Sequence, residues 1–414
     1  LYNLDFKLVA EALRERGRLL TTIAPHLVEA QPFLWPLKTP VIERAYSAVG
    51  VGMYDALARI GSKGRKTVPI QRHLSKAGAM RRFPQIKSDA LIGAIEFYDA
   101  RVDDARLVIT LIRTAMKYGA AAASRVKVTE ILKDGRGRAS GVKAVDLENG
   151  SEFTIEADRI INATGVWTEE TQDLAGGTGG LKVLASKGIH IVVPRERLKA
   201  GTGLFLRTEK SVLFIIPWQH YWVIGTTDTA WHEQLKHPVP TAEDIDYVLA
   251  HANEVLDPPL TRDDIIGTYA GLRPLIQPRL KPGADRRQTA STKVSREHTV
   301  TRVAPGLTAI AGGKLTTYRV MARDAVDHAL GEARPLDGAP AFLRAEVAWA
   351  VTHEGAAHLD DVLLRRVRLD IERRDHGLAP ATEVLEVMAP LLGWSDADVE
   401  AERAAYAERV AEIA

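Results

Sequence analysis

The chain has 414 residues, of which 46% are hydrophobic and 26% are charged, enough for two or three globular domains with their own cores. Its formal net charge is only +2, which excludes a protein built as a whole to bind polyanions. The absence of cysteine excludes a disulfide framework, a thiolate zinc site, an iron–sulfur cluster and a cysteine nucleophile. No apolar run reaches the roughly 18 residues that could span a bilayer, and no signal peptide is visible.

Helical periodicity dominates the first third of the chain. Apolar side chains recur at spacings of three and four over residues 4–20, and more strongly over residues 40–60. Residues 102–119 are predicted as a third helix. Residues 61–88 carry eight Lys or Arg and no Asp or Glu. Together with the helix before it, this stretch predicts either contact with an anionic membrane surface or a core-facing helix followed by a solvated loop.

Short β-rich runs replace the helical pattern from residue 126 onward. Strands are predicted over 127–132, 141–147, 152–157, 159–165, 189–194, 203–208, 212–218, 221–227, 265–274 and 307–313. The two runs on either side of Gln219 and His220 predict a hairpin. Helices are predicted over 241–256 and 316–331. From about residue 341 the pattern is all-helical and highly charged, which predicts a separate C-terminal domain.

The stretch "AIAGGKLTTYR", residues 309–319, joins a predicted strand to a predicted helix through two glycines and a lysine. Glycines let backbone approach a ligand closely, and the N-terminus of the helix favours an anion by about 0.3–1 kcal/mol. Lys314 adds a full positive charge. This arrangement suits a phosphate, or the negative charge at the pyrimidine end of a reduced flavin. A plain helix start after a glycine turn is the alternative.

A second turn of small residues lies at the end of another predicted strand. In "ADRIINATGVWTEE", residues 157–170, an apolar run leads into Ala163-Thr164-Gly165, where backbone can contact a dinucleotide. Alone, this stretch would be an ordinary turn that ends a strand. Together with the Gly-Gly-Lys turn and the β-rich run near residue 128, it is typical of flavoproteins.

Several longer phrases carry a family resemblance. They are "YDARVDDARLV" (98–108), "INATGVW" (161–167), "SKGIHIVVPR" (186–195), "IIPW" and "IGTTDT" (215–229), "YAGLRPL" (269–275), "VSREHTV" (294–300), "GGKLTTYR" (312–319) and "VTHEGAAHLDDVLLRRVRL" (351–369). In combination they resemble the FAD-dependent glycerol-3-phosphate dehydrogenases, over nearly the whole chain. Members of that family begin with a strand, a GxGxxG turn and a helix that hold the FAD diphosphate. The sequence lacks that unit, so we expect either further residues in the molecule or a fragment.

The resemblance implies a mixed α/β fold with three parts. Residues 1–179 and 300–335 would form a discontinuous, Rossmann-like FAD-binding domain whose N-terminal part is missing. Residues 180–299 would form an antiparallel-sheet substrate domain, and residues 340–414 an all-helical C-terminal domain.

The resemblance also implies site residues. Arg273 and Arg296 would bind the phosphate of glycerol 3-phosphate, because guanidinium suits bidentate phosphate contacts. His190 would line the substrate pocket and serve as general base, since its ordinary pKa lies near neutrality. Asp228 would orient that base or line the pocket, with capping of the next turn as the alternative. The positions that would contact the flavin are Val128, Thr164, Gly165, Trp167, Gly313, Lys314, Leu315 and Thr316, and Lys314 could instead hold a substrate oxygen.

The implied function is oxidation of glycerol 3-phosphate to dihydroxyacetone phosphate, with FAD as cofactor and a quinone or another acceptor for the electrons. One alternative is an oxidase of the same fold that uses oxygen or acts on an amine. The other is a non-catalytic, flavin-free fragment. The expected partners are the phosphate ester, a quinone and a second copy of the chain, but no nucleic acid or metal. The expected location is cytoplasmic, with peripheral attachment to the inner face of the cell membrane as a variant.

Overall fold

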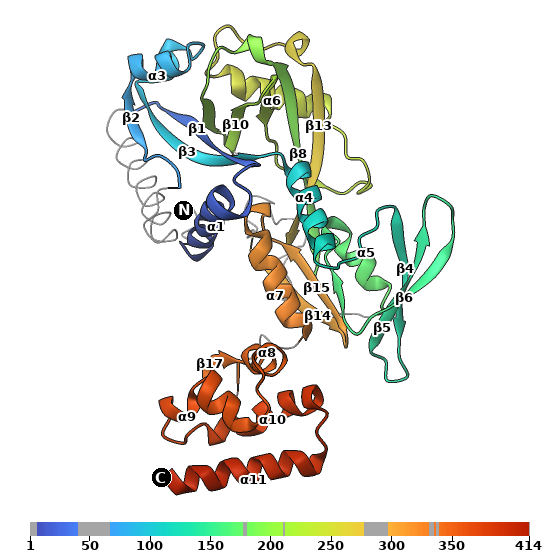
Figure 1. Ribbon diagram of the computed structural model, residues 1–414. Coiled ribbons are helices and arrows are strands. Elements are labelled where there is room, and N and C mark those ends of the chain that lie inside the picture. The colour runs from blue at the N-terminus through green and yellow to red at the C-terminus, as the bar shows by residue number, and fades with distance from the viewer. Residues whose placement is uncertain are drawn as a thin grey trace, which may run out of the picture.

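A computed structural model of the chain describes residues 6–39, 67–176, 180–209, 212–276, 297–330, 335–336 and 339–413 (Figure 1). The predicted helix 40–60 and the candidate phosphate ligand Arg296 lie outside these residues. In the described residues, no helix is long and apolar enough to cross a membrane.

The largest element is a nine-stranded sheet with the order β12-β8-β11-β10-β9-β1-β3-β2, in which β13 pairs with β8. Its strands are β1 (Val28–Leu37), β2 (Arg72–Ser75), β3 (Gly93–Val102), β8 (Val183–Pro194), β9 (Gly203–Arg207), β10 (Val212–Pro217), β11 (Tyr221–Gly225), β12 (Thr229–Trp231) and β13 (Gly267–Ile276). The predicted hairpin is confirmed as β10–β11. All neighbours are antiparallel except β1 and β9.

Strands β1, β2 and β3 are not among the strands predicted from the sequence. They extend the antiparallel sheet of the predicted substrate domain with residues from the predicted FAD-binding domain. β1 and β3 pair over ten residues each, from Val28↔Val102 to Leu37↔Gly93. The sheet therefore contains strands from both the predicted FAD-binding domain and the predicted substrate domain. The domain boundaries stay a prediction.

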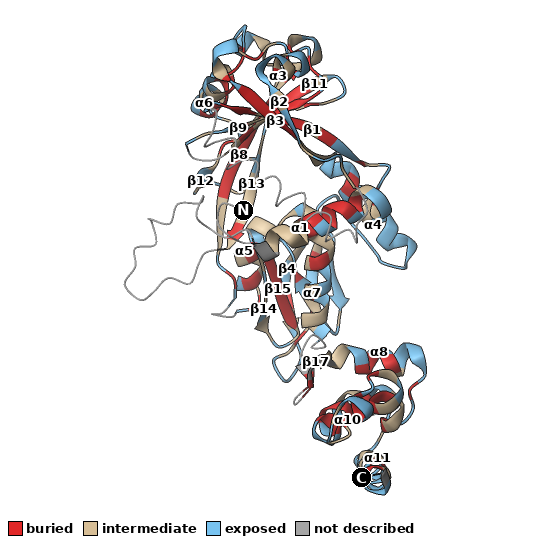
Figure 2. Cartoon of the chain, turned by 90° about the vertical axis from the view of Figure 1, so that its left-hand side faces the viewer, coloured by how far each residue is buried: buried red, intermediate tan, exposed pale blue. Residues whose placement is uncertain are grey.

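One face of this sheet is covered by helices α6 (Ala242–Asn253) and α3 (Lys76–Arg82), which pack on β8 and β3 (Figure 1). Side chains alternate along β8, so Ile189, Ile191 and Val193 are fully buried under this layer. Figure 2 shows the buried residues concentrated along the strands of the sheet. The same alternation turns Ser186, Gly188 and His190 to the opposite face.

A buried ion pair ties α6 to β8. Lys187 Nζ lies 2.6 Å from Asp244 Oδ2, and the two side chains are only 4% and 7% exposed. Asp244 also closes the capping box of α6 with Thr241. Burial opposes ionisation of Asp244, but Lys187 and Thr241 nevertheless hold its pKa below the ordinary value.

A second sheet has the order β14 (His298–Ala304), β15 (Leu307–Gly312), β7 (Ile160–Asn162), with β15 and β7 parallel. A third contains β4 (Val126–Lys133), β5 (Ala139–Asp146) and β6 (Glu152–Glu156). The helices of this part are α1 (Phe6–Arg18), α4 (Asp104–Lys117), α5 (Thr168–Asp173) and α7 (Tyr318–Leu330), with 3-10 turns η3 (Gly165–Trp167) and η7 (Leu315–Thr317). The predicted helices 4–20, 102–119 and 316–331 are confirmed within a few residues.

Helix α1 is held on the start of α7 by buried charge. The Glu15 carboxylate accepts from Arg319 Nε and Nη2 at 2.9 and 2.8 Å, and from Arg18 at 2.6 Å. Its side chain is 2% exposed. Although burial opposes it, these guanidinium groups lower the pKa of Glu15. The pair fixes the helix that follows the Gly-Gly-Lys turn.

The C-terminal part has a separate apolar core, as the sequence predicts. It contains the strand pair β16 (Pro335–Leu336) and β17 (Ala339–Leu343), followed by helices α8 (Arg344–Glu354), α9 (Leu369–Glu372), α10 (Leu378–Leu392) and α11 (Asp396–Ile413). Buried Asp370 of α9 connects this helix to α11 by accepting hydrogen bonds from Tyr406 and Arg409. The predicted fold class, mixed α/β with a helical C-terminal domain, is thus confirmed.

Replacing Lys187 by Met should destabilise the protein by about 3–5 kcal/mol, because it leaves a buried carboxylate without its cation. Urea unfolding followed by tryptophan fluorescence measures the loss. The matched control is Lys143→Met, which breaks a half-exposed pair with Glu130 (3.0 Å) and should cost under about 1 kcal/mol. Equal losses in the two variants would contradict the role given to the buried pair.

Candidate active site

The face of the sheet opposite α6 brings together the polar residues predicted from β8 and β13. Their antiparallel register places His190 opposite Tyr269, and Ser186 opposite Arg273. Because cross-strand partners point to the same side of a sheet, all four side chains share one face. His190 and Arg273, two residues of the predicted pocket, thus lie on adjacent strands and on the same face, and their roles stay a prediction.

His190 is held between two neighbouring strands. On the β11 side its ring lies over Gly225, where a Cβ atom would come within 2.5 Å of the imidazole Cδ2. On the β13 side it stacks on Tyr269, with ring centroids 4.9 Å apart and planes 16° apart. Glycine at position 225 is thus required by close approach of a side chain.

Burial, and after it the positive charge of Arg273, together lower the pKa of His190 from 6.5 to about 4. The imidazole is therefore neutral at physiological pH. A neutral imidazole has a free lone pair on one ring nitrogen, so His190 can accept a proton.

Arg273 is held in place by three groups that follow β11. Its Nη1 donates to the Thr227 carbonyl at 3.2 Å, and its Nη2 donates to Thr226 Oγ1 at 3.0 Å. The Asp228 carboxylate lies 4.0 Å from Nη1. The guanidinium lies over Gly188, because a Cβ atom there would overlap with its Nη2. With 28% of its side chain exposed, Arg273 can still reach an anion.

Asp228 lies behind Arg273 rather than on open surface. Its side chain is 3% exposed and accepts a hydrogen bond from the Ser186 hydroxyl. This placement favours support of the guanidinium by opposite charge. The predicted contact of Asp228 with substrate stays a prediction.

The two glycine turns predicted to contact a flavin lie at one edge of the small sheet. β7 and β15 are parallel neighbours, so their carboxyl ends meet at the same edge. There Thr164, Gly165 and Trp167 follow β7, and Gly313, Lys314, Leu315 and Thr316 follow β15. The edge beyond the carboxyl ends of parallel strands is where α/β sheets bind ligands.

The residues of these turns fit a planar, partly apolar group. Gly165 and Gly313 have φ of 62° and 79°, a region that favours glycine. Among the described residues, nothing lies within 4 Å of a Cβ placed on Gly165, so backbone is open to a ligand. Trp167 and Leu315 are 43% and 40% exposed beside it. Lys314 adds the cation of the second turn.

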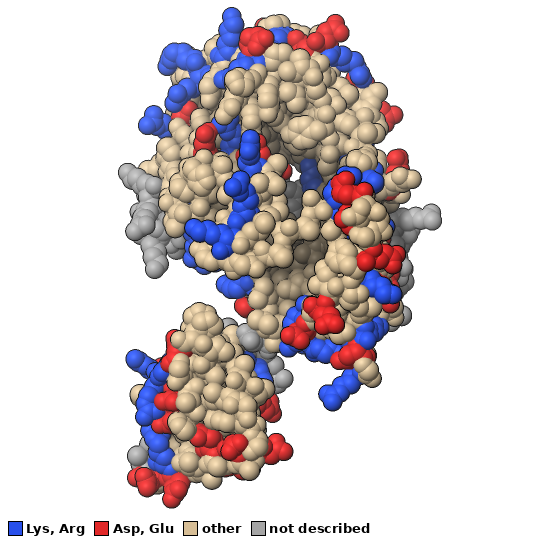
Figure 3. Space-filling view, turned by 45° about the vertical axis from the view of Figure 1, so that its right-hand side comes forward, with Lys and Arg blue, Asp and Glu red and all other residues tan. Residues whose placement is uncertain are grey.

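The sheet face and the two turns are adjacent. Turn η3 contacts β8 and β13 as well as β15. The Glu169 carboxylate of α5 accepts from the Val183 amide at 2.7 Å, at the start of β8. Gly312 lies against Ile276, the last residue of β13. Figure 3 shows the surface hollowed between the sheet and the middle of the molecule.

Val128, the remaining flavin candidate, lies on β4 and packs against the apolar cluster of Ile131 and Ile160. Its proposed backbone contact stays a prediction. The residues that sequence reasoning missed are Ser186, Gly188, Gly225, Thr226, Thr227 and Tyr269. Of these, the alternation in "SKGIH" signals only Ser186 and Gly188, and it shows which face they share without showing what they touch.

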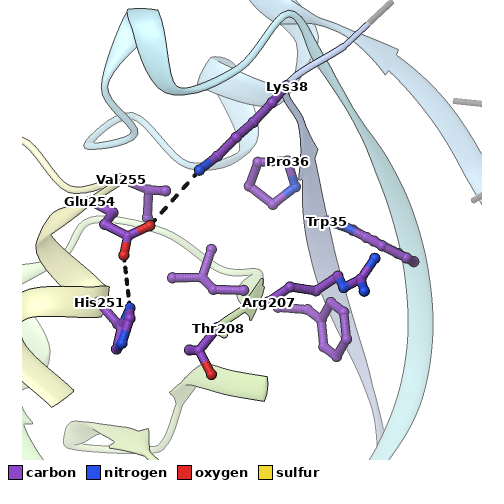
Figure 4. A pocket seen from close by; sticks show the side chains of 10 residues that line it. Trp35, Pro36, Lys38, Arg207, Thr208, His251, Glu254 and Val255 are labelled. Atoms are coloured by element: carbon purple, nitrogen blue, oxygen red, sulfur yellow. Dashed lines mark hydrogen bonds and ion pairs between the residues drawn. The ribbon is translucent and has the colours of Figure 1, made fainter. Parts of the chain in front are cut away.

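A separate cavity of about 230 Å³ lies between β1, β9 and α6 (Figure 4). Its polar groups pair with one another, since Lys38 lies 3.8 Å from Glu254, which lies 2.7 Å from His251. Trp35 and Phe205 form its apolar wall, with ring centroids 5.3 Å apart. None of the predicted site residues lines it, so it is distinct from the candidate active site.

Comparison with known proteins gives the class to which this chain belongs. Residues 2–319 match the family model of FAD dependent oxidoreductases, and residues 282–399 match the C-terminal domain of alpha-glycerophosphate oxidase. Among solved structures, the fold is shared with the FAD complex of a glycerol-3-phosphate dehydrogenase from Bacillus halodurans, with TM-score 0.59 and 24% identity over 97% of this chain and 84% of that one. The chain and its fold are those of an FAD-dependent oxidoreductase.

Sequence relatives narrow the class further. The chain is 42% identical to glycerol-3-phosphate dehydrogenase 2 of Mycobacterium bovis, over 99% of this chain and 79% of the relative. It is 34% identical to the human mitochondrial glycerol-3-phosphate dehydrogenase, over 84% of this chain and 48% of that protein. The chain therefore belongs to the glycerol-3-phosphate dehydrogenase family, with FAD as its cofactor.

The low pKa of His190 has a measurable consequence. Because the folded-state pKa lies below the ordinary 6.5, the stability it reflects is present above pH 6.5 and is lost as pH falls towards 4, by roughly 3 kcal/mol in all. NMR titration of labelled histidine should give a midpoint near 4 for the signal that His190→Asn removes. In Arg273→Met the midpoint should rise but stay below 6.5, since burial is the larger cause. A midpoint near 6.5 in the wild type would contradict the buried, neutral imidazole.

Proposed function

We propose that this protein oxidises sn-glycerol 3-phosphate at C2 to dihydroxyacetone phosphate. One observation carries the proposal: a partly exposed guanidinium, Arg273, and a neutral imidazole, His190, share one sheet face beside the two glycine turns. The names of the sequence relatives give the same substrate.

Each residue has a separate task. Arg273 binds the phosphate through its partly exposed guanidinium, which Thr226, Thr227 and Asp228 keep in position. His190 accepts the proton of the C2 hydroxyl, because its imidazole is neutral and fixed by Gly225 and Tyr269. FAD, when bound, supplies the acceptor for the hydride that leaves C2. Lys314 holds a positive charge at the turn that follows β15, where negative charge develops.

The phosphate group separates this function from its nearest alternative, an oxidase for amines. An amine substrate without phosphate offers no phosphate oxygens to the Arg273 guanidinium, and a cationic amine would be repelled by it. Arg296, which lies outside the described residues, is proposed as a second phosphate ligand. Oxygen as acceptor stays an alternative to quinone.

Anaerobic mixing with glycerol 3-phosphate, followed by flavin absorbance, tests the proposal. The wild type should bleach. Arg273→Ala should raise KM by about tenfold or more, since a charge-assisted hydrogen bond is worth about 1.5–3 kcal/mol, with flavin content unchanged. His190→Asn should slow bleaching by about 10²–10⁴-fold at saturating substrate, which is the usual contribution of a general base.

Two controls decide between binding and folding. Arg273→Lys keeps the charge but loses the planar fork, so its KM should lie between those of wild type and Arg273→Ala. If Arg273→Ala lost flavin to the same extent as it lost substrate binding, the role of Arg273 would be in folding and not in binding the phosphate. An unchanged bleaching rate in His190→Asn would remove His190 as base, and a wild type that never bleaches would end the proposal.

We further propose that electrons pass to a membrane quinone and that the protein attaches peripherally, with a second copy of the chain as partner. The observation that supports peripheral attachment is a basic flank formed by Arg72, Lys76 and Arg81, all exposed on β2 and α3. Figure 3 shows Lys and Arg side chains gathered at the upper left, in the part that holds the sheet. Each such charge contributes about 1 kcal/mol near an anionic surface.

Co-sedimentation with vesicles tests this attachment. Replacing Arg72, Lys76 and Arg81 by Ala should weaken binding to phosphatidylserine vesicles by about one to two orders of magnitude, and high salt should do the same. The control removes three scattered exposed charges, with Lys127→Ala, Lys236→Ala and Arg374→Ala. Equal effects of the two triple variants would mean that net charge, not the flank, drives binding.

A further inference from the structure

Two glycines face each other across β8 and β13 in the middle of the candidate site. The register pairs Gly188 with Gly271. On one side of this pair lie the stacked rings of His190 and Tyr269, and on the other lies Arg273. Each neighbour on the same face is two residues away along its strand, about 7 Å. The pair therefore carries no side chain of its own between the stacked rings and the Cα atom of Arg273.

The two glycines differ in what lies above them. The space over Gly188 is filled by the guanidinium of Arg273, and Gly188 is buried. Gly271 is exposed, and in the described residues nothing lies within 4 Å of a Cβ placed on it. The space above the glycine pair is thus filled on β8 and open on β13.

Backbone conformation does not explain a glycine at position 271. It lies inside β13 and is not among the glycines with positive φ. Glycine inside a strand loses stability relative to residues with side chains, and there it commonly marks close approach of a ligand or another backbone. The open space above Gly271 is therefore consistent with close approach of a ligand.

We propose that Gly271 is a specificity-determining residue, the floor on which the carbon chain of a small phosphate ester lies between His190 and Arg273. This inference rests on the proposed function, whose base lies at one end of the glycine pair and whose phosphate ligand, the Arg273 guanidinium, lies over Gly188. A side chain at position 271 would occupy the space of the substrate carbons, while leaving the guanidinium free to bind phosphate alone. The ligand class is a short polyol phosphate, since a longer or branched ester would meet the stacked rings of His190 and Tyr269.

The test compares Gly271→Ala with Gly267→Ala in the full, FAD-loaded chain. Gly267 lies on the same strand and the same face, and a Cβ there would make only an ordinary 3.9 Å contact with Val192. Two ligands are measured by calorimetry, glycerol 3-phosphate and inorganic phosphate, and KM is measured by flavin bleaching. Thermal unfolding records the effect on the fold.

Gly271→Ala should weaken binding of glycerol 3-phosphate and raise its KM by about tenfold or more, the effect of one methyl group too many in a tight pocket. Its affinity for inorganic phosphate should stay within about twofold, and its melting temperature should be unchanged or higher. Gly267→Ala should change none of these. Gly188→Ala, which displaces Arg273, should weaken both ligands.

Three outcomes would overturn the inference. Unchanged glycerol 3-phosphate binding in Gly271→Ala would show that the substrate does not lie there. Equal weakening of inorganic phosphate would show that the substitution acts through Arg273. A lowered melting temperature with loss of both ligands would make Gly271 a folding residue. If the wild type binds inorganic phosphate but is not bleached by glycerol 3-phosphate, the proposed function fails first and the inference fails with it.

Discussion

The pairing of β8 with its neighbours is the constraint on which the site depends. β13 pairs with it from Val183 to Val192, while β11 and β12 pair with other stretches of the same strand. Because side chains alternate, burying Ile189, Ile191 and Val193 beneath α6 forces Ser186, Gly188 and His190 to the opposite face. A slip of one residue would bury His190 in the apolar core and expose the isoleucines. The burial of the apolar side chains in the core therefore fixes which residues lie on the face of the candidate active site.

Charge on that face is balanced by neighbouring strands. The Asp228 carboxylate lies beside Arg273 and accepts a hydrogen bond from Ser186. It compensates part of the positive charge of Arg273 in the absence of substrate. Burial, with the positive charge of Arg273 as the second cause, lowers the pKa of His190 and keeps its imidazole uncharged. The same guanidinium that suits a phosphate thus also favours the neutral imidazole, the form in which a base must start. The two functions depend on one arrangement of charges.

The sequence patterns predicted the strands that are determined by their own residues. They missed the strands that are stabilised by pairing with strands far away in the chain. The runs at 126–133, 203–207 and 221–225 become strands as predicted. β1 is missed because "VEAQPFLWPL" contains two prolines and is stabilised by distant β3 and β9. β8 is predicted from residue 189 but begins at Val183, because the polar "SKG" is tolerated only where Asp244 buries the charge of Lys187. Pairing partners far along the chain decide both cases.

The candidate site shows the same division at the level of single residues. His190, Arg273 and the two glycine turns were predicted from residue type and family phrases, but their contacts depend on register. Gly225 lies beneath an imidazole and Gly188 beneath a guanidinium, and no pattern in one strand shows what a neighbouring strand will place over it. Glycine lowers the stability of a strand, so each of these positions gives up stability for the close approach of a functional side chain. The glycines, which leave space for His190 and Arg273, therefore determine the shape of this face as much as the side chains do.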